Sequence, residues 1–589
     1  MRKHIENIKH FVLKELKGFP FFWLSLFVLF IIVIEIGFKI SPFIDTSIQW
    51  IYNLGLAVAI FSLVYKYVIQ FRKKFRVVLF DFLCLLLFVL VLFNRLGWIL
   101  MLPELLSASI WVYLALLLFF LRELSDKKIN LYTSTFNPAQ LLIFSFLALI
   151  LLGCGFLLLP NATYDGISLI DALFTATSAV CVTGLIVVET GSYFTSFGQI
   201  VILVLIQLGG IGIMTFASYF SFFFKGGSTY ENQLLLKDMT NSEKLGEVFE
   251  TLKKILFLTF FIEAIGAILI FFTLDNSMIS SFSDQVFFSV FHAISGFCNA
   301  GFSTLGNNLY EPGFNLNYPL HLIIAFLFVL GSIGFPIIFN LFKYLKFYIL
   351  KTFTKIMGRR ASVNLVWVVN FNSRITLATT FILIFGGMFF FLIFEYNNAL
   401  SNHSFWGKLV TSFFGSTART SGFNTFDTSM LHFPTLFILM FLMWVGASPA
   451  SVGGGIKTST LAVATLNILS IAKGKNRIEA FGREISQNTV KRSFAIIMLS
   501  LVAIGLSVLL LAFFEPDSSL ISIIFESVSA YSTTGYSMGI TQDLSGIGKF
   551  IITVTMFVGR MTMLTVLIAF MKKMRVSNYR YPTEEILIN

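Results

Sequence analysis

One short pattern occurs four times in the chain, and it constrains the fold more than any other feature. Each copy has a serine six residues before a glycine, a small or hydroxyl residue after that serine, and a bulky apolar residue after the glycine. The copies read FTATSAVCVTGLI, FHAISGFCNAGFS, SFFGSTARTSGFN and FESVSAYSTTGYS. Their glycines, Gly184, Gly301, Gly422 and Gly535, are separated by 117, 121 and 113 residues. A repeat of this length predicts four copies of one structural unit.

The four copies lie between long apolar segments. The chain has 589 residues, of which 57% are hydrophobic and only 12% charged. Because a helix needs about 20 apolar residues to cross a bilayer, the sequence predicts an all-α membrane protein with about twelve spans. Four spans are predicted near 19–38, 50–70, 77–94 and 98–121, and the others near 139–159, 197–222, 255–274, 319–342, 374–394, 435–470, 494–514 and 547–571.

Lys and Arg are distributed unevenly between the two sides of these spans. With the N-terminus inside, all but seven of the 42 Lys and Arg fall in cytoplasmic segments or at their helix ends. The exceptions are Lys39, Arg95, Lys408, Arg419 and Lys549 outside, and Lys457 and Arg560 within spans. This asymmetry follows the positive-inside rule and predicts a cytoplasmic N-terminus. The net charge of +12 therefore reflects topology and requires no nucleic-acid partner.

Each unit of the repeat reads as a span, a short re-entrant helix, a glycine loop and a second span. Non-helical backbone at membrane depth is tolerated only inside protein or beside a water-filled cavity. Four such loops around one axis would present rings of carbonyls that can replace the water around a dehydrated cation. Glycine allows the backbone to turn its carbonyl inward, and the C-terminus of each short helix favours a cation below. Small-residue packing between helices is the alternative, and it explains one copy better than four.

The predicted selectivity filter consists of each glycine and the two residues before it. These residues are Val182, Thr183, Gly184, Asn299, Ala300, Gly301, Thr420, Ser421, Gly422, Thr533, Thr534 and Gly535.

The loops resemble the pore loops of the Trk/Ktr/HKT superfamily of potassium-translocating membrane subunits. TATSAVCVTGL is close to the family's first pore loop and GFCNAGFS to its second, and the resemblance covers roughly residues 135–575. It implies four span–pore-loop–span repeats around a pseudo-fourfold pore, imitating a tetrameric potassium channel. Some plant and fungal relatives carry serine at the first filter glycine, which admits sodium. Glycine in all four copies therefore implies a preference for K+ at the filter carbonyls.

The resemblance also implies partners and location. Family members are homodimers in the cytoplasmic membrane, and each subunit has its own pore. Regulation usually comes from a separate cytosolic ring of nucleotide-binding RCK subunits, so a nucleotide would act only through that partner. Candidate docking segments are the basic loops 225–254, 343–373 and 473–492. Sodium assists or activates some relatives, but no residue here identifies a sodium site.

The predicted span 435–470 is longer than a bilayer requires and contains the stretch GASPASVGGGIKTST. Proline and three consecutive glycines disfavour a regular helix, so a broken helix with a loop inside the membrane is predicted. GGGIKT resembles the signature of the family's gate loop. Arg560 in the last span resembles a family arginine that lies near this loop and whose charge raises the barrier to cations, although the MTM that follows it departs from the family pattern. Structural pairing of Arg560 with a carbonyl or an acid is the alternative. The predicted gate residues are Gly446, Gly453, Gly454, Gly455, Lys457 and Arg560.

The chain divides into an N-terminal four-span extension at 1–130 and four repeats at 131–253, 254–365, 366–490 and 491–589. The third repeat contains the gate loop, and the fourth includes the C-terminal tail. Four helices before a pore invite comparison with a voltage sensor. A voltage sensor carries arginines at every third position of its fourth helix, and the predicted span 98–121 has no such series. A scaffold or a dimer contact is therefore the better interpretation of these four spans.

Several polar residues in the spans have open roles. Arg419 could pair with Asp427 or tune conductance, and Glu263 could be functional or structural. Cys181 and Cys298 are interpreted as small buried residues at the ends of short helices.

Three other functional classes compete with a cation pore. A symporter with alternating access would show inverted repeats, whereas the four units here share one orientation; coupling of potassium to sodium or protons stays open. A membrane enzyme would need clustered catalytic groups, but the six histidines are scattered, so no enzymatic activity is predicted. A non-conducting scaffold would not need four glycine loops.

Overall fold

The computed structural model describes residues 20–38, 42–70, 79–96, 109–126, 138–225, 248–275, 278–356, 369–475 and 477–571. The described chain is mostly helical, with a single two-stranded pairing of Glu479–Ala480 and Arg483–Glu484. The predicted cytoplasmic segment before the first span lies outside the described residues, as does most of the predicted docking loop 225–254.

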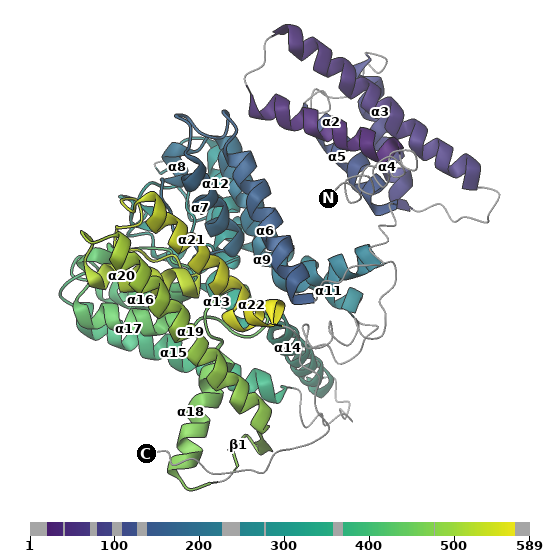
Figure 1. Cartoon of the computed structure of the whole chain (residues 1–589). Helices are drawn as coiled ribbons and strands as arrows, with labels where there is room; N and C mark the ends of the chain where they lie inside the picture. Colours follow the sequence, from purple (N-terminus) through teal and green to yellow (C-terminus); the bar gives the residue numbers. More distant parts are fainter. Residues whose placement is uncertain are drawn as a thin grey trace.

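The first helices form a group of their own around one apolar core. They are α2 (Pro20–Gly37), α3 (Pro42–Gln70), α4 (Leu79–Arg95) and α5 (Ser109–Asp126). Phe88 of α4 and Phe119 of α5 are fully buried in this core. These helices are drawn in purple and blue in Figure 1, set apart from the remaining helices. Their positions overlap the four predicted N-terminal spans, although residues 77–78 of the third and 98–108 of the fourth are not described, and only α3 is by itself long and apolar enough to cross a membrane.

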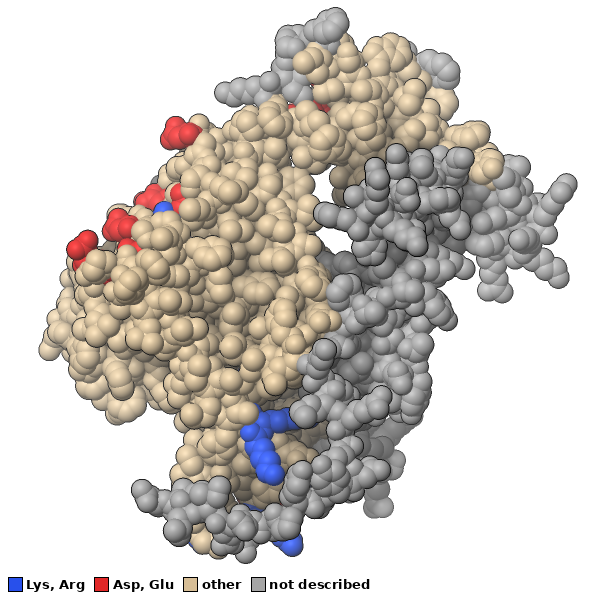
Figure 2. Space-filling model, in the orientation of Figure 1, with Lys and Arg blue, Asp and Glu red and all other residues tan. Residues whose placement is uncertain are grey.

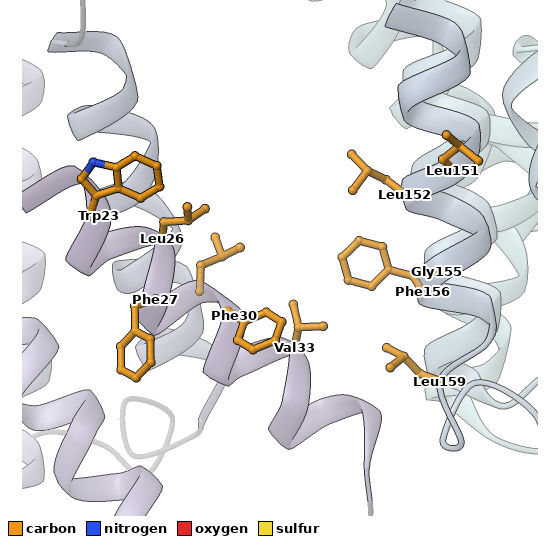
Figure 3. Close-up of a pocket in the computed structure, with 11 residues that line it drawn as sticks. Trp23, Leu26, Phe27, Phe30, Val33, Leu151, Leu152, Gly155, Phe156 and Leu159 are labelled. Carbon is orange, nitrogen blue, oxygen red and sulfur yellow. The ribbon is translucent and has the colours of Figure 1, made fainter. Parts of the chain in front are cut away.

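The group touches the rest of the chain through α2. The amide side chain of Asn161 donates to the carbonyl of Ile36 at 2.9 Å, and its backbone N–H donates to Gly37 at 3.0 Å. Beyond this contact, α2 and α6 (Pro138–Leu157) diverge across a cavity of about 620 Å³. Figure 3 shows apolar side chains from both helices facing this space, among them Phe30 and Leu152.

The long helices after residue 138 largely follow the predicted spans. They are α6, α9 (Ser196–Lys225), α11 (Val248–Phe271), α13 (Tyr318–Ile333), α14 (Phe335–Ile356), α15 (Phe371–Glu395), α17 (Phe433–Trp444), α18 (Thr458–Ala472), α19 (Gln487–Phe514), α21 (Gly546–Met561) and α22 (Met563–Phe570). The very short α8 (Thr190–Tyr193) follows the first glycine loop.

Three of the predicted spans are broken rather than continuous. Only the break between α17 and α18 was predicted, and the structure confirms it. The predicted span 319–342 bends by 104° between α13 and α14 at Gly334, and the span 547–571 bends by 87° at Thr562. By length and composition, four described helices could cross a membrane alone, or up to six when each bent pair counts as one crossing.

Four short helices lie between the longer ones, as the repeat predicts. They are α7 (Leu169–Cys181), α12 (Phe282–Phe297), α16 (Phe405–Thr417) and α20 (Leu520–Ser532), and Figure 1 shows them in the body of the molecule. A serine precedes each of them, and in three the hydroxyl, of Ser168, Ser404 or Ser519, accepts a backbone N–H from the third residue of the helix. Such caps satisfy N–H groups that the first turn leaves unpaired.

Charge separates along the molecule. On the face in Figure 2, acidic side chains gather at the end where α7 and α8 lie, and the basic side chains lie mainly at the opposite end near α18.

Candidate functional site

The repeated glycines adopt a backbone conformation that other residues avoid. Their φ angles are +87° at Gly184, +72° at Gly301, +70° at Gly422 and +100° at Gly535. In three loops the residue two positions earlier also has positive φ, at Val182, Asn299 and Thr533. The third loop differs, because a short 3-10 turn, Ala418–Thr420, replaces that conformation.

Each glycine lies against the carbonyl of the residue before the next glycine. A side-chain carbon added to any of them would collide with that oxygen. The glycine and the carbonyl it meets are Gly184 with Ala300, Gly301 with Ser421, Gly422 with Thr534, and Gly535 with Thr183. The contacts run from the first loop to the fourth and then back to the first, so the four loops form a closed ring.

In three of the four repeats, the serine six residues before the glycine fixes the loop that follows it. Ser178 and Ser529 accept the backbone N–H of Gly184 and Gly535, both at 3.1 Å. Ser295 donates to the carbonyl of Phe302 at 2.7 Å, which holds the second loop just after its glycine. In the third repeat, the hydroxyl of Ser416 instead donates to Ile384 of α15 at 2.7 Å.

The twelve predicted filter residues come together. All are buried, and hydrogen bonds join neighbouring loops. The Thr420 hydroxyl donates to the side-chain oxygen of Asn299 at 2.9 Å, and the Thr534 hydroxyl donates to the Arg419 carbonyl at 3.1 Å. A single cavity of about 370 Å³ lies on one side of the ring and touches all four glycines. Such a ring, with one face open to a cavity, can present backbone oxygens to an ion.

The segment between α17 and α18 lies beside the ring of glycine loops. Gly454 is in contact with the Thr533 side chain, and Gly446 lies against the Gly454 carbonyl. Gly453 faces Ala447, and Gly455 has a φ of +66°. Backbone bonds tie the loop to α13: the Ser448 N–H donates to the carbonyl of Ser332 at 2.9 Å.

Two cations contact this loop. Arg560 of α21 donates to the carbonyl of Val452 and, at 2.7 Å, to the carbonyl of Gly209 in α9. Lys457 donates to the carbonyl of Gly453 at 2.6 Å. The predicted gate residues are therefore adjacent in space, and Arg560 connects the loop to two other helices.

Arg419 does not pair with Asp427. Its guanidinium donates to the carbonyls of Val445 at 2.6 Å and Leu442 at 3.3 Å, at the C-terminal end of α17. These carbonyls lack a partner within the helix, so a buried cation suits them. Asp427 instead accepts from the backbone and hydroxyl of Ser429.

The other buried polar residues have local partners. Glu263 accepts from the side-chain amide of Gln207 at 3.0 Å, and the Cys298 thiol lies 3.8 Å from its other oxygen. Cys181 and Cys298 are buried free thiols at the ends of α7 and α12, as predicted.

Sequence reasoning missed a second set of glycines. Gly209, Gly331 and Gly559, each on the span after a loop, lie against the carbonyls of Val180, Phe297 and Tyr531. Each of those carbonyls belongs to the residue four positions before a repeated glycine. The sequence contained a signal for this set, since a second glycine follows the repeated glycine by 25, 30 and 24 residues in these repeats.

Comparison with known proteins agrees with this geometry. A family model described as TrkH, cation transport protein, matches residues 109–580. The chain belongs to the TrkH family of cation transport proteins. It is a multi-pass membrane transporter and not an enzyme.

Two relatives of this TrkH-family chain are similar over nearly their whole length. The potassium/sodium uptake protein NtpJ of Enterococcus hirae is 35% identical over 77% of this chain and 97% of its own. The Ktr system potassium uptake protein B of Bacillus subtilis is 36% identical over 77% of this chain and 96% of its own. The crystal structure of the potassium transporter TrkH from Vibrio parahaemolyticus has a similar fold, with a TM-score of 0.58 and 16% identity over 89% of this chain and 98% of that chain.

Proposed function

We propose that this chain takes up potassium through a channel-like pore whose selectivity filter is the ring of four glycine loops. The observation that carries the proposal is the closed order of contacts from Gly184 through Gly301 and Gly422 to Gly535. In this proposal the repeats 131–253, 254–365, 366–490 and 491–589 surround a pseudo-fourfold axis. The names of the relatives, which mention potassium uptake, support K+ as the ion.

Potassium enters from the cavity, exchanges water for the carbonyls of the ring, and meets the loop around residues 446–457. That loop and the Arg560 charge form the barrier, because the guanidinium is anchored to the loop carbonyl of Val452. Inward flow is driven by the membrane potential, which supplies about 2.3 kcal/mol per charge per 100 mV. The barrier opens when the loop moves away from the filter.

The protein resides in the cytoplasmic membrane with its N-terminus inside. The acidic end of the molecule then faces outward, where the cavity opens, and the basic end faces the cytoplasm, as the positive-inside rule favours. Acidic groups outside also favour cations near the mouth.

The chain works as a homodimer with a cytosolic nucleotide-binding RCK-type regulator on its basic loops. The relative named as part of a Ktr system supports a multi-component assembly. The regulator, not this chain, binds the nucleotide.

A sodium- or proton-coupled potassium symporter is the second candidate. The name of the Enterococcus relative, which includes sodium, favours it. A symporter would need sodium or proton movement in fixed ratio to potassium, whereas a pore would not.

Growth of a potassium-uptake-deficient bacterium at low potassium tests the proposal. Wild type should restore growth, and Gly422→Asp should abolish it at equal membrane abundance, because the added side chain meets the Thr534 carbonyl. Equal growth of wild type and variant would contradict the filter assignment.

A further inference from the structure

The second and fourth loops share a hydrogen-bonded arrangement that the first and third lack. Nine residues before the filter glycine lies His292 in the second repeat and Glu526 in the fourth, both fully buried in their short helices. Two residues after the glycine lies a serine in each case, Ser303 and Ser537.

In both contacts the serine hydroxyl is the donor, and the buried side chain of the short helix is the acceptor. The Nδ1 of His292 lies 2.8 Å from the Phe288 carbonyl, which can only accept, so in the neutral ring Nδ1 carries the hydrogen. Nε2, 2.8 Å from the Ser303 oxygen, is then an acceptor for the serine hydroxyl. In the fourth repeat, the Glu526 carboxylate accepts from the Ser537 hydroxyl and, at 3.0 Å, from Thr541.

The backbone closes both arrangements in the same way. The N–H four residues after each filter glycine donates to the serine oxygen, from Leu305 to Ser303 at 3.1 Å and from Gly539 to Ser537 at 2.9 Å. An acceptor at one helix position, a serine donor and a returning N–H therefore recur in two repeats, although the acceptor is a histidine in one and a glutamate in the other.

The corresponding positions of the other repeats cannot form this arrangement. Nine residues before the glycine lie Thr175 and Phe413, and two residues after it lie Ile186 and Asn424. The buried Thr175 hydroxyl has no hydrogen-bond partner among the described residues.

All four residues that follow the glycines by two positions line the cavity beside the filter. They are Ile186, Ser303, Asn424 and Ser537. These four residues form the layer next to the glycine ring on its cavity side. The contacts of the Ser303 and Ser537 hydroxyls therefore fix two of the four members of this layer.

We propose that His292 and Glu526 are positioning residues that hold the cavity-side edge of the filter through Ser303 and Ser537, and thereby set its discrimination between potassium and sodium. This inference rests on the proposed function. Ion preference depends on the spacing and stiffness of the surrounding oxygens, and loss of one contact loosens the edge at one loop.

The test is rubidium tracer uptake by the full chain in potassium-uptake-deficient cells, with potassium or sodium as competitor. Ser303→Ala and Ser537→Ala remove the hydroxyl and leave the buried His292 and Glu526 in place. In each of these two variants, sodium should compete with rubidium about three- to tenfold better, relative to potassium, than it does in wild type. This factor corresponds to the free energy of one net hydrogen bond. Thr175→Val is the matched control, because its hydroxyl holds no loop, and it should leave the ratio unchanged.

Glu526→Gln and the double variant with Ser537→Ala separate positioning from general stability. If Glu526 acts through the serine, sodium should compete relative to potassium in the double variant as it does in Ser537→Ala alone. If the two residues act independently, the effects of the two substitutions would add. The inference would be overturned if sodium competed relative to potassium in both serine variants as it does in wild type. The proposed function would still stand in that case, provided that wild type takes up rubidium and Gly422→Asp abolishes the uptake. No uptake by wild type, or uptake indifferent to Gly422→Asp, would overturn the proposed function and this inference together.

Discussion

At the scale of single residues, buried cations donate to backbone carbonyls, most of them at or near the break after α17. Arg419 donates to Leu442 and Val445 where α17 ends, and Arg560 donates to Val452 and Gly209. Arg419 thus joins the third glycine loop to the end of α17, and Arg560 joins α21 to the loop between α17 and α18 and to α9. Neither contact pairs a cation with an acid, which explains why searching the sequence for a carboxylate partner of Arg419 failed.

Arg419→Gln should destabilise the protein, because glutamine is too short to reach both carbonyls and leaves buried acceptors unpaired. The loss should be about 1–3 kcal/mol, seen as a lower thermal midpoint in detergent. Lys473→Gln, at an exposed position, is the control. Identical midpoints for the two variants would show that these contacts contribute nothing.

Arg560→Gln should raise rubidium uptake by about tenfold or more at equal abundance. A unit charge about 8 Å from an ion costs about 2 kcal/mol at an effective dielectric constant of about 20, and the variant removes that cost. Arg560→Lys keeps the charge and should leave uptake low. Uptake that falls in the Gln variant and not in the Lys variant would assign the arginine a structural role instead.

At the scale of elements, the sequence predicts where the chain is apolar better than where its helices bend. The break at 446–457 was predictable because a proline and three glycines disfavour helix there. The bends at Gly334 and Thr562 depend on one residue each and on packing against distant segments, as when Gly334 meets the Pro449 carbonyl. Hydropathy carries no information on such contacts.

The four short helices and their loops were predictable to within a few residues, since the repeat places them. The neighbour of each loop was not predictable, because the ring depends on carbonyl contacts between residues more than a hundred positions apart. The contacts from His292 to Ser303 and from Glu526 to Ser537 were hidden for a related reason. They join different residue types at equivalent positions, which a search for identical motifs overlooks.

Gly334→Ala should loosen the loop between α17 and α18. Gly334 has a φ of +89°, and an added carbon would lie 2.7 Å from the Pro449 carbonyl. We expect regulator-independent rubidium uptake to rise about fivefold, as the strain of about 1–3 kcal/mol shifts the loop from its closed position. Gly386→Ala, where the added carbon meets no atom within 4 Å, should behave as wild type. A Gly334 variant indistinguishable from that control would contradict a restraining role for the bend.

At the scale of the whole molecule, the N-terminal helices are joined to the rest by few contacts. Their core is separate, and the contact at one end runs through Asn161 to the end of α2. The family model begins at residue 109, so α2, α3 and α4 lie outside the match.

Removal of residues 1–130 should therefore leave uptake within about twofold of the full chain at equal abundance. The face of α6 that is uncovered is apolar, so lipid can cover it, and the hydrogen bonds lost at this junction are those from Asn161 to the end of α2. Rubidium uptake of the shortened chain checks this expectation. An abundant but inactive shortened chain would show that the N-terminal helices take part in transport.

The central claim is that potassium passes through the ring of four glycines. The most direct test is rubidium uptake by the four single variants Gly184→Ala, Gly301→Ala, Gly422→Ala and Gly535→Ala, at matched membrane abundance. Gly505→Ala is the control, because its added carbon meets no atom within 4 Å. Since each filter alanine would meet a carbonyl of the adjoining loop at positive φ, all four should lose uptake by about tenfold or more, at a cost of about 1–3 kcal/mol each. Uptake equal to the control in any of the four would contradict a closed filter ring.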